Sequence, residues 1–244
     1  MKLVSPCIQW CILATIIDAT LADRRIDEEE TYWPNQDIIR ALENKDKKSW
    51  MLYRTLRRSP PRSENTCVYA EVKGKESDGK SYKFEQGYKT GDGTEKTEIL
   101  YAFPYQTESW EGKNRSKENA MRVKQNKESP NGKGYQLIYS DYKCCDILRV
   151  LEEDNGAACE LYLHDGCVSE PVPSPCASQY QLACGRGSAY KNQVYNESCR
   201  SAIEVTTKPS TEAPDDKEPP KEPNPEAPQT PEEATTTSTL PPGC

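Results

Sequence analysis

Short runs with an apolar residue at every second position alternate along the chain with polar connectors rich in Gly, Pro, Asn, Asp and Ser. A period of two is typical of strands with one buried face, and the connectors hold the residues that turns favour. Two helices are also indicated, one after a cap at Asn35 or Asp37 and a short one at residues 178–183. The pattern predicts eight strands, at residues 50–56, 67–73, 82–89, 96–103, 120–124, 135–142, 146–151 and 159–164.

Eight strands joined in order by hairpin-length connectors indicate an antiparallel meander. A meander of eight closes naturally into a barrel, which removes its exposed edges and leaves room for one small ligand. A sandwich of two sheets stays open as an alternative, because periodicity does not reveal how a sheet closes. The predicted fold class is all-β, an eight-stranded antiparallel barrel with a short helix near each end.

The two ends of the chain differ from this middle part. An apolar run from Leu3 to Ile17, followed by small residues and then by charge at Asp23, has the layout of a cleavable secretory signal rather than a membrane anchor. We therefore predict a signal peptide at 1–22 and a secreted, extracellular protein. From 205 to 244 the chain consists mainly of Pro, Thr, Glu and Lys, which predicts a disordered tail after a barrel domain at 23–204.

Charge and motifs argue against several functions. Most of the net charge of −7 falls on the tail, which has eight acidic residues and three lysines, so neither nucleic-acid nor polybasic membrane binding is indicated. The chain has no nucleophile-elbow motif and no phosphate-binding loop, so an enzyme is not expected, and no cofactor is implied. The single histidine, His164, lies beside Asp165 near a strand end, and we expect it at the surface.

The cysteines indicate a disulfide framework. Once Cys7 and Cys11 leave with the signal, nine remain, eight of them in the folded region. Cys244 is the odd one, so an otherwise monomeric protein has a route to a disulfide-linked dimer. A metal site is disfavoured by the lone histidine and the lack of Cys-x-x-Cys pairs. Asn114 and Asn196 begin sequons that predict glycosylation.

Two apolar strands bounded by cysteines carry two carboxylates and an aromatic ring, those of Asp146, Glu160 and Tyr162. Charge is costly there unless a cation meets it. Alternation puts Glu160 and Tyr162 on one face of their strand. We expect a pocket in which the carboxylates hold a small amine and the ring packs on Tyr162. Alternatives stay open: Asp146 as a cap of a backbone amide, Glu160 in a salt bridge with Arg149, and Tyr162 as core.

These residues resemble the salivary lipocalins of ticks, the histamine-binding protein family. The resemblance rests on Cys145-Asp146-Ile147, Glu160-Leu161-Tyr162 and Cys176, which match the amine-binding signature of the family in residue type and spacing. It extends over about residues 35–200. It implies a barrel that sequesters a host amine such as histamine or serotonin, with Asp146, Glu160 and Tyr162 in contact with the ligand. The family's Asp and Trp ahead of the cysteine equivalent to Cys67 are absent here, so a complete two-site binder is not implied.

The same resemblance implies part of the disulfide pattern. It pairs Cys67 with Cys199 and Cys145 with Cys176. Four cysteines then remain with three possible connectivities, namely Cys144, Cys159, Cys167 and Cys184.

Two other functions remain open at this point. The barrel could hold a lipid mediator such as a leukotriene or fatty acid, which a basic residue inside it, Arg54 or Arg149, would favour. It could instead serve as a protein-interaction module against a host immune protein, which a pocket filled by its own side chains would favour.

Overall fold

Nine strands build the sheet of the computed structural model, which describes residues 25–56, 64–109 and 112–200. The strands are β1 (Lys48–Arg54), β2 (Thr66–Lys75), β3 (Tyr82–Lys89), β4 (Glu95–Tyr105), β5 (Ala120–Lys124), β6 (Lys133–Ser140), β7 (Cys145–Val150), β8 (Cys159–His164) and β9 (Asn192–Gln193). The described helices are α2 (Ile38–Leu42) and α3 (Ser174–Cys184), with the 3-10 helices η1 (Ile26–Glu28), η2 (Glu30–Asn35), η3 (Asp154–Gly156) and η4 (Ser188–Tyr190).

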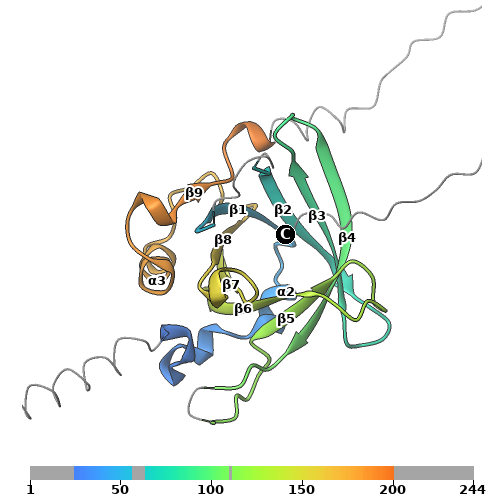
Figure 1. The fold of residues 1–244 in the computed structure, drawn as a ribbon, viewed down its shortest axis with the longest axis vertical. Coiled ribbons are helices and arrows are strands. Elements are labelled where there is room, and N and C mark those ends of the chain that lie inside the picture. Colours follow the sequence, from blue (N-terminus) through green and yellow to red (C-terminus); the bar gives the residue numbers. More distant parts are fainter. Residues whose placement is uncertain (1–24, 57–63, 110–111, 201–244) are drawn as a thin grey trace, which may run out of the picture. The chain divides into compact units, whose positions relative to one another are not determined.

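The first strand closes the sheet. Strands β2 to β8 follow one another in order, and β1 pairs antiparallel with β8 on one side and with β2 on the other. The sheet therefore curls into a closed barrel of eight strands, to which β9 adds a short pairing with the end of β1 (Figure 1). All eight predicted strands are present. The predicted barrel is confirmed, and the sandwich alternative is wrong.

Asp-Gly turns set two successive hairpins. Between β2 and β3, Asp78 accepts hydrogen bonds from two backbone amides of its own turn, and Gly79 has a φ of +67°. Between β3 and β4, Asp92 accepts from the amide of Thr94, and Gly93 has a φ of +83°. Residues with a Cβ rarely adopt such angles, so these pairs of residues specify both turns and the register of the strands that they join.

Helix α2 covers one end of the barrel. Its cap is Asp37, whose carboxylate accepts from the backbone amide of Arg40 at 3.0 Å. A side-chain acceptor at this position satisfies an amide that has no partner within the helix. Ile38 and Leu42 are buried, and together with Ala41 they face the barrel interior.

Helix α3 packs on the outside of the barrel, against β6, β7 and η1 (Figure 1). Disulfides fasten it at both ends, since Cys176 is bonded to Cys145 of β7 and Cys184 to Cys159 of β8. The helix begins before the predicted segment, with a proline in its first turn, where the missing amide costs nothing.

A buried ion pair joins the barrel wall to the N-terminal segment. Arg149 of β7 donates from Nε to Oδ2 of Asp27 at 2.9 Å and from Nη2 to Oδ1 at 2.6 Å. The two side chains are only 2% and 1% exposed. In the β7–β8 pairing Arg149 lies opposite Cys159, whereas Glu160 lies opposite Leu148, so Arg149 and Glu160 face opposite sides of the wall. The expected alternative of a Glu160–Arg149 salt bridge is wrong.

The other two disulfides hold the chain's loops. Cys67–Cys199 ties the C-terminal segment to β2, beside a hydrogen bond from the amide of Cys67 to the carbonyl of Val194. Cys144–Cys167 links the β6–β7 turn to the loop after β8. The structure thus contains both pairs implied by the resemblance, and the four cysteines left open pair as Cys144–Cys167 and Cys159–Cys184.

Some predictions fall outside these residues. The signal at 1–22, the tail at 205–244 and Cys244 lie in parts of the chain that are not described, and the domain boundaries remain predictions. Within the described ranges, no helix is long and apolar enough to cross a membrane. Asn114 and Asn196 are exposed, and their glycosylation stays a prediction.

Candidate ligand cavity inside the barrel

A cavity of about 100 Å³ lies inside the barrel beneath α2. One buried water needs at least roughly 10–15 Å³ of such space, so the cavity has room for more than a single water. Its apolar wall comes from Ile38, Ala41, Leu42, Ala70, Val72, Phe84, Leu100, Met121, Val123, Leu137 and Leu148. Its polar wall comes from Asp46, Lys47, Ser49, Gln86, Tyr135, Asp146, Tyr162 and His164.

Asp146 supplies a carboxylate to this cavity. Its Oδ2 lies 2.9 Å from Nε2 of His164, and its Oδ1 is buried without a hydrogen-bond partner. The structure does not support Asp146 as a cap of a backbone amide. That role belongs to Asp141, which accepts from the backbone amides of Lys143, Cys144 and Cys145.

His164 is the cavity residue that sequence reasoning missed. We expected it at the surface, but it is 1% exposed. Strand β8 continues through it, because its amide donates to the carbonyl of Cys144. The alternation that turns Glu160 and Tyr162 inward turns His164 inward as well, and this parity was the signal that could have found it.

Both ring nitrogens of His164 face acceptors. Nδ1 lies 3.0 Å from the carbonyl oxygen of Lys143, and Nε2 lies 2.9 Å from Oδ2 of Asp146. Burial opposes the charged ring, but the hydrogen bond and the charge of Asp146, with the Lys143 carbonyl, outweigh it. The pKa of His164 is therefore raised above its ordinary value of 6.5.

Glu160 lies behind Tyr162. The hydroxyl of Tyr162 donates to Oε2 of Glu160 at 3.1 Å, and Glu160 is 6% exposed but does not line the cavity. In the β1–β8 pairing it lies opposite Arg54, which is also buried. The structure thus brings Asp146 and Tyr162 to the cavity and leaves Glu160 one layer further from it. Of the two arginines considered for the interior, Arg54 lies inside the barrel and Arg149 outside.

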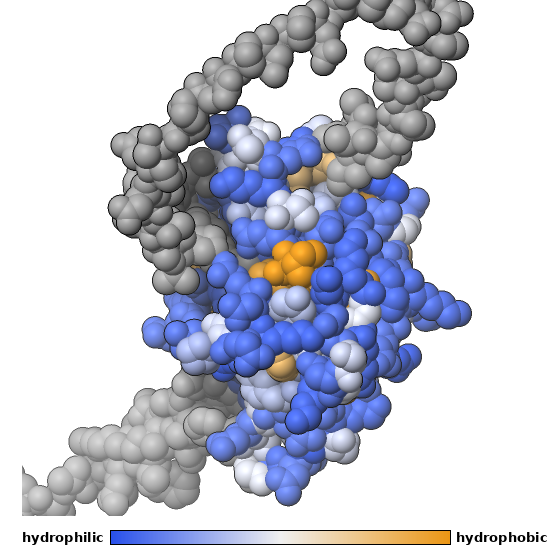
Figure 2. Space-filling model, turned by 90° about the vertical axis from the view of Figure 1, so that its right-hand side faces the viewer, coloured by the Kyte–Doolittle hydropathy of each residue, from blue (hydrophilic) through white to orange (hydrophobic). Residues whose placement is uncertain are grey.

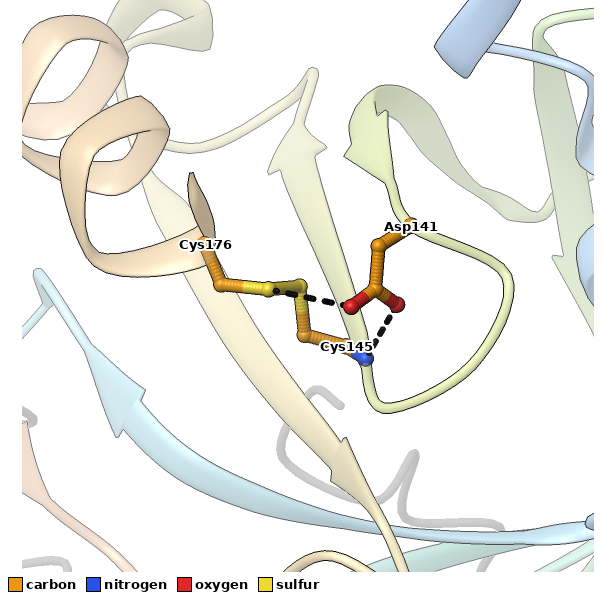
Figure 3. A group of neighbouring side chains, drawn as sticks. All are labelled: Asp141, Cys145 and Cys176. Atoms are coloured by element: carbon orange, nitrogen blue, oxygen red, sulfur yellow. Dashed lines mark hydrogen bonds between the residues drawn. A yellow bond between two sulfur atoms is a disulfide. The ribbon is translucent and has the colours of Figure 1, made fainter. Parts of the chain in front are cut away.

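Asp141, Cys145 and Cys176 form the one group in the described part of the chain whose ligand atoms are spaced for a metal ion (Figure 3). Both sulfurs belong to a single disulfide, so neither can act as a thiolate ligand. Burial alone would raise the pKa of Asp141, but its three backbone hydrogen bonds lower it. The cluster is a turn held by a disulfide and by the hydrogen bonds of Asp141, and it fixes the start of β7, next to Asp146.

A closed antiparallel barrel around a small, mostly apolar cavity with a few polar groups defines a lipocalin-type binding protein for small molecules. The model of a protein family described as tick histamine binding protein matches residues 26–201. The chain belongs to this family of tick histamine-binding proteins.

Solved structures with a similar fold come from crustaceans and ticks. Lobster apocrustacyanin A1 is 14% identical over 72% of this chain and 91% of its own, with a TM-score of 0.45. Apocrustacyanin C2 is 14% identical over 74% and 92%, with a TM-score of 0.47. Japanin from Rhipicephalus appendiculatus, bound to cholesterol, is 14% identical over 58% and 89%, with a TM-score of 0.40. Likenesses at this level do not bear on function. No curated protein sequence matches the chain.

Proposed function

We propose that the cavity binds a small cationic amine, histamine or serotonin, and that the secreted protein sequesters this mediator in a host. The observation that carries the proposal is that Asp146, a residue that lines the cavity, has a buried carboxylate oxygen, Oδ1, without a hydrogen-bond partner. Such an atom costs about 1–3 kcal/mol unless a donor reaches it, and an ammonium group is a strong donor.

The size of the cavity supports an amine. A space of about 100 Å³, well above the roughly 10–15 Å³ that one water needs, suits a small ligand such as histamine, and serotonin is somewhat larger. The ammonium would give up its hydration for Asp146, while the flat ring packs on Tyr162 and the apolar wall. Binding of this kind acts by stoichiometry, because each barrel removes one molecule from solution, and no chemical step is needed.

Calorimetry with matched ligands tests the proposal. We expect histamine or serotonin to bind with a micromolar or lower Kd at about pH 8, and their neutral analogues imidazole-4-ethanol and 5-hydroxytryptophol to bind much more weakly, because a hydroxyl cannot neutralise Asp146.

Asp146→Asn should weaken amine binding by about 1.5–3 kcal/mol, roughly 10- to 150-fold. Asp92→Asn removes a carboxylate from an exposed hairpin and serves as the control. Equal binding by the Asp146→Asn variant and wild type would refute the proposal.

A lipid carboxylate is the second candidate, because Arg54 is buried inside the barrel. However, Arg54 does not line the cavity, whereas the carboxylate-bearing Asp146 does, and a negative charge there repels the carboxylate of a lipid. Binding of arachidonate without binding of either amine would make the lipid the ligand.

A protein partner finds less support. The face that Figure 2 shows is hydrophilic, apart from small apolar areas. Over the described residues, the large apolar side chains that are exposed are Ile99, Leu182 and Tyr190. Scattered single residues of this kind are normal on a soluble protein and do not mark a docking surface.

A further inference from the structure

We infer that His164 is the proton switch of the amine site: its protonated ring neutralises Asp146 in the empty barrel, and the ring releases that proton when an amine binds. The inference rests on the proposed function and adds the regulation of the same site.

The geometry of the empty site holds a proton on each ring nitrogen. A neutral imidazole has one N–H and one lone pair. At His164 the lone pair would face either the carbonyl oxygen of Lys143, 3.0 Å from Nδ1, or the carboxylate of Asp146, 2.9 Å from Nε2. Two lone pairs at such a distance repel each other, whereas the imidazolium donates to both acceptors. The ring is 1% exposed, so water does not relieve the conflict.

An arriving ammonium changes this balance. It donates to Oδ1 of Asp146, the oxygen without a partner, and would leave two cations beside one carboxylate in a space of low dielectric. The N–H bond at Nε2 breaks, and its proton leaves to solvent. The N–H at Nδ1 keeps its hydrogen bond to Lys143, and the ammonium donates both to the lone pair on Nε2 and to the carboxylate, so these two acceptors no longer face each other without a proton between them. The site itself is neutral before and after, because the ammonium replaces the ring as the cation beside the carboxylate, and the released proton carries one positive charge to solvent.

None of the other groups around His164 that the structure describes replaces it as the counter-ion of Asp146. Asp46 and Lys47, from the segment before β1, and Ser49 of β1 line the same cavity. The carboxylate of Asp46 already accepts from the backbone amides of Lys48 and Gly166. Asp141 in the β6–β7 turn accepts from three backbone amides, and on β8 itself the Tyr162 hydroxyl donates to Glu160. His164 is therefore the group whose charge can change between pH 5 and 8.

The consequence is an affinity that depends on pH. Where His164 is protonated in the free protein, each unit of pH lost should weaken amine binding by up to about tenfold, because one proton is released per ligand. Above its pKa the affinity should level off. The barrel would hold its amine at neutral and mildly basic pH and release it in acid.

The chain has one histidine, so an NMR titration needs no assignment by mutagenesis. The imidazole resonances of the full-length, isotope-labelled protein are followed against pH, alone and with saturating unlabelled histamine and, in parallel, serotonin. We expect the pKa of His164 to fall when either amine is bound, and to stay unchanged with imidazole-4-ethanol. An amine that binds but leaves the pKa of His164 unchanged overturns the inference while the proposed function stands.

A variant gives the second measurement. The ratio of Kd values at about pH 5.5 and about pH 8 should be at least about tenfold larger in wild type than in His164→Gln, since the titration of the ligand itself is common to both. If the variant does not fold, the NMR titration of His164 in wild type still tests the inference. Equal ratios overturn the inference, and a wild type that binds neither amine overturns the proposed function with it.

Discussion

Two buried pairs of a carboxylate and a cation lie on opposite faces of β7. On the outer face, Arg149 makes two hydrogen bonds to Asp27, at 2.9 and 2.6 Å, and both oxygens of the carboxylate are used. On the inner face, Asp146 accepts one hydrogen bond from His164 at 2.9 Å and keeps one oxygen without a partner. The outer pair is complete, and the inner pair has a place for one more donor.

The difference separates a structural pair from one suited to a ligand. Burying two charges costs several kcal/mol per ion, which only full pairing offsets. The outer pair meets this condition and fastens the N-terminal segment to the barrel. The inner pair does not, because Oδ1 of Asp146 has no donor, and both residues of this pair line the cavity.

The largest effect should come from breaking the outer pair. Asp27→Asn leaves the guanidinium of Arg149 buried without a counter-charge, so we expect the free energy of unfolding in urea to fall by about 3–5 kcal/mol. The control is Glu152→Gln, which breaks the half-exposed pair with Arg122 and should cost at most about 1 kcal/mol. Equal costs for the two variants would mean that the outer pair is not a structural element.

A substitution of Glu160 tests whether this third buried carboxylate serves mainly stability or mainly ligand binding. Glu160→Gln keeps an acceptor for the Tyr162 hydroxyl, so histamine binding should weaken by about 0.5–1.5 kcal/mol, less than in Asp146→Asn. Stability should fall by up to about 1 kcal/mol, because the charge opposite Arg54 is lost. Calorimetry and urea unfolding measure both quantities, with the exposed Glu170→Gln as control. A loss of affinity larger than that of Asp146→Asn would make Glu160 the main ligand carboxylate.

The smallest effect should be the pH dependence of the ligand-free protein. Because folding raises the pKa of His164 above 6.5, its protonated ring contributes stability that is fully present below that pH. This contribution is lost as the pH rises through the pKa of the folded state. The difference in unfolding free energy between wild type and His164→Gln should therefore shrink from about pH 6 upward. A difference that grows with pH would show that the inner pair is not an imidazolium–carboxylate pair.

Local signals in the sequence specify most of the barrel. Alternation gives the eight strands, Asp-Gly pairs give two of the turns, and a capping residue gives α2, because each depends on neighbours within a few residues. The two-residue β9 and the 3-10 helices carry no period long enough to detect. Long-range contacts hold two of these segments against the barrel: Cys67–Cys199 fastens the segment of β9, and the Arg149–Asp27 pair fastens that of η1.

The candidate site was predictable in part. Parity was enough to turn Tyr162 inward, and His164 with it, because the strand predicted at 159–164 already included both residues. The partner of Arg149 is 122 residues away along the chain, and no pattern in the sequence indicates it. The volume of the cavity depends on how α2 packs over the strands, so the choice between an amine and a lipid could not be made from the sequence.

The closure of the barrel through β1 has a consequence for the order of folding. The pairing of Ser49 with His164 joins the first and last strands of the eight-stranded barrel, so it carries a larger loop-closure cost than the pairing of any two consecutive strands. The pair of Asp146 and His164, by contrast, lies within the single hairpin of β7 and β8 and can form locally, while water still reaches it. We expect the pair of Asp146 and His164 to form first, and β1 and α2 to dock last. The pairing of β1 with β8 is then the step that excludes water from the cavity.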